Sequence, residues 1–186
     1  MSNLPSSYSQ FIEQVKNNIR LARLNSLRAI NRETVELYYK VGNMLAGKVA
    51  GEGWGQSVVV KISQDIQTEF AGIKGFSTSN LWRMKAFYEE VAGDEKLVMP
   101  SREIGWSHNY TILERVKDTA GRIFYMDMCR DKGWSVETLR EKIRDDEFGK
   151  YQLFQSNFEQ ALEPERMAQV RWQFKDEYNM SLLGLR

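Results

Sequence analysis

The sequence predicts an all-α protein, with an N-terminal helical hairpin followed by two tandem helix-turn-helix-like units. Apolar residues recur every three or four positions along most of the 186-residue chain, which is the spacing of helices buried on one face. Turns that contain glycine interrupt this pattern, and four of them share the order glycine, aromatic residue, small residue. We therefore expect short helices joined by capped turns.

The composition is that of an ordinary globular protein, with 42% hydrophobic and 27% charged residues. The net charge of +1 says little, but residues 1–48 hold seven Lys or Arg against three Asp or Glu. This excess makes the N-terminal helices a candidate surface for a polyanion, although a basic helical face is more often simply solvated. No signal peptide and no apolar run of about 18 residues occurs, so we expect a cytoplasmic protein without membrane contact.

Residues 1–50 form the first predicted unit. A helix can begin at Ser6 or Ser7, and its apolar positions are Phe11, Ile12, Val15, Ile19 and Ala22. A second helical pattern follows through Leu27, Ile30, Val35, Leu37, Tyr38, Val41 and Leu45. The two patterns can belong to one long helix, or to a hairpin that turns around Asn25 and Ser26 or around residues 31–34. We expect the hairpin.

The glycine-rich residues 51–55 separate this hairpin from the next helix. They lack the lysine and the Ser/Thr of a phosphate-binding P-loop, and no strand precedes them, so we interpret them as a loop and helix cap. The helix that follows is expected over residues 57–70. Its apolar stripe consists of Val58, Val59, Ile62, Ile66 and Phe70.

The glycine–aromatic–small signature occurs at residues 53–55, 75–77, 105–107 and 133–135. At each place the glycine can close the preceding turn, the aromatic residue can pack as a hydrophobic staple, and the small residue can cap the next helix. The four sites form two pairs, which predict one unit at 53–92 and another at 105–147. Residues 93–101, which include Pro100, are expected to be a loop.

The second unit is predicted to hold helices over residues 107–117, 119–131 and 135–146. The last of these mixes acidic and basic residues, which is typical of an exposed helix that does not read DNA. The chain thus divides into residues 1–50, 51–147 and 148–186. The third part is predicted to be a helix at 151–161 and then a linker, whose closing apolar residues look like the beginning of a further segment.

The second helix of the first unit carries the strongest functional signal. Its first turn is polar and uncharged, cations follow, and no acidic residue occurs before Glu89. Such a helix end suits an approach to the phosphates and base edges of DNA. The candidate contact residues are Ser77, Thr78, Ser79, Asn80, Arg83 and Lys85. Weaker candidates, as contacts to backbone phosphates, are Arg20, Arg23 and Arg28.

Trp82 is the anomaly of this helix. By helical spacing, the inward face consists of Leu81, Met84, Tyr88 and Val91. We therefore expect Trp82 to point outward. It can pack beneath a neighbouring helix or a partner subunit. Alternatively, Trp82 and Arg83 stack on a base and contact a phosphate, which adds Trp82 to the candidate nucleic-acid contacts.

We find no catalytic or metal-binding constellation in the sequence. His108 lies at a predicted helix N-terminus, where a structural hydrogen bond is favoured over acid–base catalysis. Cys129 lies in an apolar run and is interpreted as a buried, inert thiol. The carboxylates at 145–147 cluster at the end of a helix, where we expect solvated charges rather than metal ligands. We expect neither a metal nor a cofactor.

Several separated runs of the sequence together resemble one known family. They are LYYKVGNMLAGK at residues 37–48, GFSTSNLW at 75–82, IGWSH at 104–108 and FYMDMCRDKGWS at 124–135. In order and spacing these runs are similar to the N-terminal domain of the YhcG-type family of bacterial PD-(D/E)XK nuclease-like proteins. The resemblance covers about residues 10–160. Family members usually carry proline at the position of Ala71 and tryptophan at that of Tyr39.

The resemblance implies a DNA-binding, winged-helix-like module that precedes a C-terminal nuclease domain. Residues 174–185 resemble the junction at which that domain begins, and the family's catalytic Asp, Glu and Lys have no counterparts here. We expect either a piece cut from a longer protein or a natural protein that keeps only the recognition half. The prediction is a non-catalytic module that binds double-stranded DNA, with a homodimer through the N-terminal helices as a further expectation. The alternative is a protein-interaction or oligomerisation module.

Overall fold

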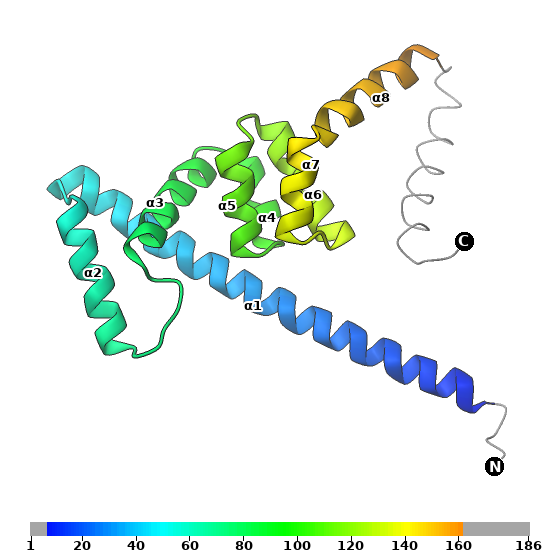
Figure 1. Ribbon diagram of the computed structural model, residues 1–186, viewed down its shortest axis with the longest axis horizontal. Helices are drawn as coiled ribbons and strands as arrows, with labels where there is room; N and C mark the ends of the chain where they lie inside the picture. The colour runs from blue at the N-terminus through cyan, green and yellow to red at the C-terminus, as the bar shows by residue number, and fades with distance from the viewer. Residues whose placement is uncertain (1–6, 162–186) are drawn as a thin grey trace.

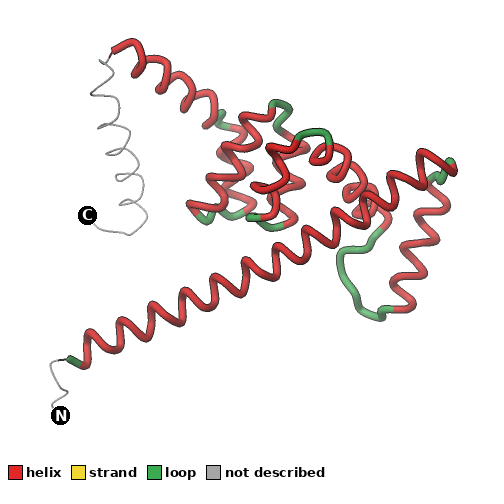
Figure 2. The backbone as a smooth tube through the Cα atoms, turned by 180° about the vertical axis from the view of Figure 1, so that it is seen from behind, coloured by secondary structure: helices red, strands yellow, loops and turns green. Residues whose placement is uncertain are grey.

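The computed structural model describes residues 7–161 (Figure 1). Within this range it holds eight α-helices and no strand, which confirms the all-α class (Figure 2). The wing of a winged helix therefore has no counterpart among these residues, and the predicted linker after residue 161 lies outside them. The helices are α1 Tyr8–Glu52, α2 Gln56–Glu69, α3 Thr78–Ala92, α4 Glu95–Arg102, α5 Trp106–Arg115, α6 Thr119–Lys132, α7 Val136–Arg144 and α8 Glu147–Ala161.

The predicted N-terminal hairpin is wrong, because α1 is a single helix of 45 residues. Neither predicted turn contains glycine or proline, the strongest helix breakers. The hydroxyl groups of Ser26 and Thr34 instead donate to the carbonyl oxygens four residues earlier in the helix, at 2.9 and 2.8 Å. The helix ends at Gly53, whose φ of 66° is left-handed backbone.

α2 turns back from the end of α1 and packs against α3 (Figure 1). Val59 of α2 is fully buried, but Phe70, predicted in the same stripe, exposes 58% of its surface. The prediction fails at Phe70 because α2 ends at Glu69 and residues 70–77 form a loop. Ser63 Oγ fixes the far end of this loop by donating to the carbonyl oxygen of Phe76 at 2.8 Å.

α1 crosses α3 at Gly42, and this crossing requires a glycine. A Cβ atom at Gly42 would stand 2.1 Å from the carbonyl oxygen of Met84. The two backbones can therefore come this close only without a side chain. One turn to either side, Tyr38 and Leu45 of α1 are buried.

The predicted loop at residues 93–101 is wrong, because most of it forms α4. The Asp94 side chain caps this helix by accepting a hydrogen bond from Lys96 N at 3.1 Å. Pro100 lies inside α4 and removes one backbone donor. The helix nevertheless forms because it buries Leu97 completely and Ser101 almost so.

The glycine–aromatic–small signature has its predicted capping role before α3 and α7. Ser77 and Ser135 each accept a hydrogen bond from a backbone N–H three residues on, at 3.3 and 3.1 Å. Before α5 the prediction is wrong in detail. Gly105 is the N-cap there, with a φ of −70°, and Ser107 lies inside the helix.

Two clusters of buried apolar residues make up the core. The α2 cluster consists of Tyr38, Leu45, Val59, Phe76, Leu81 and Met84. The α4–α7 cluster consists of Val35, Phe87, Val91, Leu97, Ile104, Ile112, Val116, Tyr125, Met126, Cys129 and Leu139. The Trp106 ring joins the clusters, because its centroid lies 4.9 Å from that of Tyr38 and 5.2 Å from that of Phe87.

The N-terminal half of α1 projects away from this core as a straight helix (Figures 1 and 2). We call residues 8–30 the arm. No residue of the arm is buried, and Phe11, Leu27 and Ile30 expose 62%, 60% and 62% of their surface. The second half of α1, by contrast, packs on α3, α4 and α5. The arm thus presents both its cations and its apolar side chains.

Candidate nucleic-acid interface

The first turn of α3 presents hydroxyl groups at the surface. Ser77 and Ser79 are exposed, and Thr78 is half-buried. The Ser77 hydroxyl also caps the helix, because it accepts the hydrogen bond from Asn80 N. The remaining N–H groups of this turn give the helix end a partial positive charge, which favours an anion.

Asn80, a predicted contact residue, belongs to the core and is 8% exposed. Its Nδ2 donates to the carbonyl oxygen of Gly75, and its Oδ1 accepts a hydrogen bond from Trp106 Nε1 at 3.0 Å. Both ends of the amide are therefore engaged within the protein. Asn80 holds the 70–77 loop and α5 against α3.

Trp82 does not point outward as predicted. Its side chain packs against the α2 cluster, and its Nε1 is buried without a hydrogen-bond partner among the described residues. Helical spacing missed this contact because α2 covers a second side of α3 (Figure 1). The packing favours the structural alternative over stacking on a base.

The two predicted cations of α3 differ in their surroundings. Lys85 Nζ lies 2.6 Å from the Glu89 carboxylate, and 18% of the lysine side chain is exposed. The exposed Arg83 guanidinium instead lies over the Tyr110 ring of α5, 4.1 Å from its centroid. Stacking leaves the edge of the guanidinium, with its N–H groups, available for a phosphate. Arg83 is therefore the better placed of the two.

The predicted arginines of the arm are all exposed. Arg20 donates to the Asn17 side chain at 2.8 Å, and within residues 7–161 no carboxylate is bonded to Arg20, Arg23 or Arg28. Several exposed lysines of α1 and α2 differ, because each pairs with a carboxylate three or four residues away. These lysines are Lys16, Lys40, Lys48 and Lys61. The arm therefore carries three exposed arginines without a bonded carboxylate among the described residues.

The structure does not bring the α3 and arm residues together. α3 crosses α1 at Gly42, and Arg28 lies fourteen residues before that crossing, or about 21 Å along the helix axis. Arg20 lies about 12 Å further away. The predicted residues thus form two separate candidate surfaces.

His108 makes a hydrogen bond at the start of its helix and Cys129 is buried, as predicted. His108 Nε2 donates to the carbonyl oxygen of Trp134 at 2.8 Å, which ties the start of α5 to the turn before α7. Burial raises the pKa of the Cys129 thiol to about 12, because the interior disfavours the thiolate. Such a thiol is unreactive at neutral pH.

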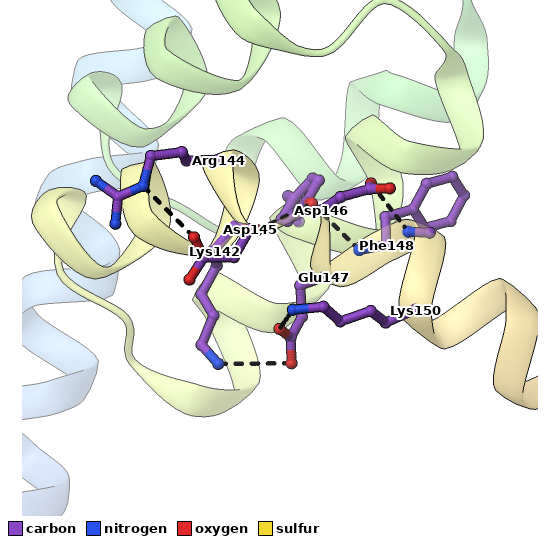
Figure 3. Close-up of polar contacts among 9 residues, drawn as sticks. Lys142, Arg144, Asp145, Asp146, Glu147, Phe148 and Lys150 are labelled. Atoms are coloured by element: carbon purple, nitrogen blue, oxygen red, sulfur yellow. Dashed lines mark hydrogen bonds and ion pairs between the residues drawn. The ribbon is translucent and has the colours of Figure 1, made fainter.

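The carboxylates at the junction of α7 and α8 have local partners (Figure 3). Glu147 pairs with two lysines at 3.5 and 4.0 Å, and Asp145 accepts from an arginine at 3.4 Å. Asp146 Oδ1 accepts a hydrogen bond from the Gly149 backbone at the start of α8. The cations beside them are Lys142, Arg144 and Lys150. In the part of the chain that the structure describes, no three potential metal ligands come together.

Sequence reasoning missed two features of these surfaces. The contact of Tyr110 with Arg83 joins two residues that are 27 positions apart in the sequence, and no local pattern predicts it. The second feature, the uncovered arm, had a signal in the sequence. Residues 14–32 contain five Lys or Arg and no Asp or Glu, while their apolar residues leave no single polar face.

The described residues define an all-α module with exposed cations on two separate helices. Residues 14–150 match the DUF1016 N-terminal domain, and the chain belongs to this family. No curated protein and no solved structure matches the chain. Among the described helices, none has the length and hydropathy that crossing a bilayer requires.

Proposed function

We propose that this chain is a non-catalytic module that binds double-stranded DNA. The observation that carries the proposal is the set of exposed arginines Arg20, Arg23 and Arg28, which lie in an acid-free stretch, spread over about 140° around the helix, and have no bonded carboxylate among the described residues. Such arginines contact phosphates and release the counterions condensed on the duplex. In this proposal the arm supplies most of the affinity.

α3 supplies a second contact in this proposal. The Ser77 and Ser79 hydroxyls are exposed, and Arg83 lies on the Tyr110 ring one turn further along the helix. In the two predicted units, the turn 116–118 between α5 and α6 has a turn length of helix-turn-helix proteins, whereas the longer loop 70–77 leads into α3. The module would deliver a PD-(D/E)XK nuclease domain of the YhcG-type family to DNA in the cytoplasm.

A salt titration tests the proposal. The anisotropy of a fluorescent duplex measures binding, and replacing Arg20, Arg23 and Arg28 with alanine together is expected to weaken it. Three lost phosphate contacts should also flatten the slope of log K against log salt by about 2.7. Arg83→Ala alone should flatten it by about 0.9.

Lys61→Ala is the matched control, because Lys61 is exposed but pairs with Asp65 at 2.6 Å. Its salt slope should equal that of the unmodified protein. A triple arginine variant that binds the duplex with unchanged affinity and slope contradicts the proposal, as does an equal loss in Lys61→Ala.

A protein-interaction module is the second candidate, and the apolar residues of the arm favour it. Phe11, Leu27 and Ile30 expose about 60% of their surface, and phosphate contact does not require them. Phe11 and Leu27 lie about 160° apart around the helix, so these side chains are on different sides of the arm. Exposed apolar side chains that gather on one helix commonly mark a protein interface.

A further inference from the structure

The arm carries an apolar stripe with the period of a coiled coil. Its positions are spaced alternately by four and three residues, which is the heptad spacing of a continuous contact line along one side of a helix. We call this line the seam. The seam consists of Tyr8, Ile12, Val15, Ile19, Ala22, Ser26 and Ala29.

The seam lies on the side of α1 that faces away from the core. Val15 of the seam and Val35 of the core are twenty residues apart, which places them about 160° apart around the helix. Tyr8 and Ile19 expose 42% and 48% of their surface. The described part of the chain leaves the seam uncovered, although most helices in proteins owe their stability to packing of an apolar face.

Residue size changes along the seam. Its N-terminal part holds the large residues Tyr8, Ile12, Val15 and Ile19. Its C-terminal part holds the small residues Ala22, Ser26 and Ala29. A partner that fills this surface must therefore be small where the first part is large, and large where the second part is small.

We propose that the partner is the seam of a second copy of this chain, running antiparallel. A twofold axis that passes between Ile19 and Ala22 places each large seam residue from Ile12 to Ile19 of one copy opposite a small seam residue of the other. The opposed pairs are Ile12 with Ala29, Val15 with Ser26, and Ile19 with Ala22. A parallel pair would set small against small and leave half of the seam unfilled.

The area of the seam suits a weak, concentration-dependent pair. Each copy contributes five large side chains, including Phe11 beside the seam. Ile12 and Val15 are already half-buried, so burial of the five side chains from two copies removes less than about 1,000 Å² from water, the range of weak and transient interfaces. No residue of the arm is buried against the core, so the core leaves the seam open.

The same pairing gathers cations on one flank of the dimer. Lys16 and Arg23 occupy equivalent heptad positions beside the seam, so Lys16 of one copy lies near Arg23 of the other. Lys16 pairs with Glu13 of its own arm, whereas Arg23 has no bonded carboxylate among the described residues, so the two Arg23 side chains supply most of this flank's attraction for a polyanion. DNA should therefore tighten the dimer. Of the consequences of the pairing, only this one rests on the proposed function.

Sedimentation equilibrium of the full chain, without nucleic acid, tests the pairing. The average mass should rise to that of a dimer with concentration, and Ile19→Glu should return it to that of a monomer. Leu24→Glu is the matched control, because Leu24 is 44% exposed against 48% for Ile19 but lies on the other side of the arm. Circular dichroism verifies that both variants fold.

A chain that stays monomeric at every concentration overturns the pairing. So does a dimer that Leu24→Glu dissociates and Ile19→Glu does not. Because DNA is absent from this experiment, failure of DNA binding leaves its outcome unchanged.

Disulfide formation between two variants tests the orientation. Protein with Ile12→Cys is mixed with protein with Ala29→Cys and oxidised; the native Cys129 is buried and stays in place. The mixed disulfide should dominate over either homodisulfide. Dominant homodisulfides at both positions indicate a parallel pair and overturn the antiparallel arrangement.

Discussion

The two halves of α1 form one helix but are stabilised differently. In the second half, Val35, Tyr38 and Leu45 are 1%, 8% and 5% exposed and pack in the two clusters. In the arm no residue is buried. Backbone geometry is the same in both halves, so the difference lies in what covers their apolar side chains. The second half is stabilised by its own chain, whereas the described residues leave the apolar side chains of the arm uncovered, which is why we propose a partner for the arm.

Two glycines of α1 give the largest expected contrast. Gly42→Ala should destabilise the fold by about 3 kcal/mol, because its Cβ would stand 2.1 Å from the Met84 carbonyl oxygen and force α1 and α3 apart. Gly47→Ala should instead stabilise it by about 0.5–1 kcal/mol, because no atom lies within 4 Å of the new Cβ. Urea unfolding measures both values. Equal effects at the two positions would contradict the described crossing.

Two asparagines extend the comparison to hydrogen bonds. Asn80→Ala should cost about 1–3 kcal/mol, because it leaves the part-buried Trp106 Nε1 without its acceptor. In the arm, Asn17→Ala removes an exposed bond to Arg20 and should change stability by less than about 0.5 kcal/mol. Thermal unfolding of the two variants, followed by circular dichroism, makes the test. A comparable loss at Asn17 would indicate that the arm contributes to the folded core.

Thiol reactivity also distinguishes the core from the arm, and it does so without a large change in stability. Burial raises the pKa of the Cys129 thiol to about 12, so at pH 8 almost none of it is the reactive thiolate. We expect slow reaction with a thiol reagent until the protein unfolds, and faster reaction as pH rises toward 12. Leu24→Cys, in the arm, should react at the rate of an exposed cysteine. Rapid modification of native Cys129 would contradict its burial.

The sequence predicted best what local chemistry decides. The helices of the second unit, the capping roles of Ser77 and Ser135, and the inert Cys129 follow from spacing, turn residues and local hydrophobicity. These features need no knowledge of distant parts of the chain. Their agreement with the structure therefore reflects strong local signals.

The failures arise where tertiary packing or context decides. Ser26 and Thr34 suit a turn and a helix equally, because their hydroxyls can bond either backbone. Burial of Leu97 stabilises a helix around Pro100 that the sequence alone disfavours. From the sequence alone, Asn80 fits a surface contact residue. Its hydrogen bond to Trp106, 26 residues away, shows that it belongs to the core. The predicted site differs most from the structure because contacts with distant parts of the chain decide whether its residues are buried or exposed.

Amide hydrogen exchange along α1 tests most directly whether the arm depends on a second copy. We predict that residues 35–45 exchange slowly at every protein concentration, because their opening requires unfolding of the core. Residues 8–30 should exchange quickly in dilute protein and become protected as concentration rises. An arm that is as protected as residues 35–45 in dilute monomer, or unprotected at every concentration, would contradict the account.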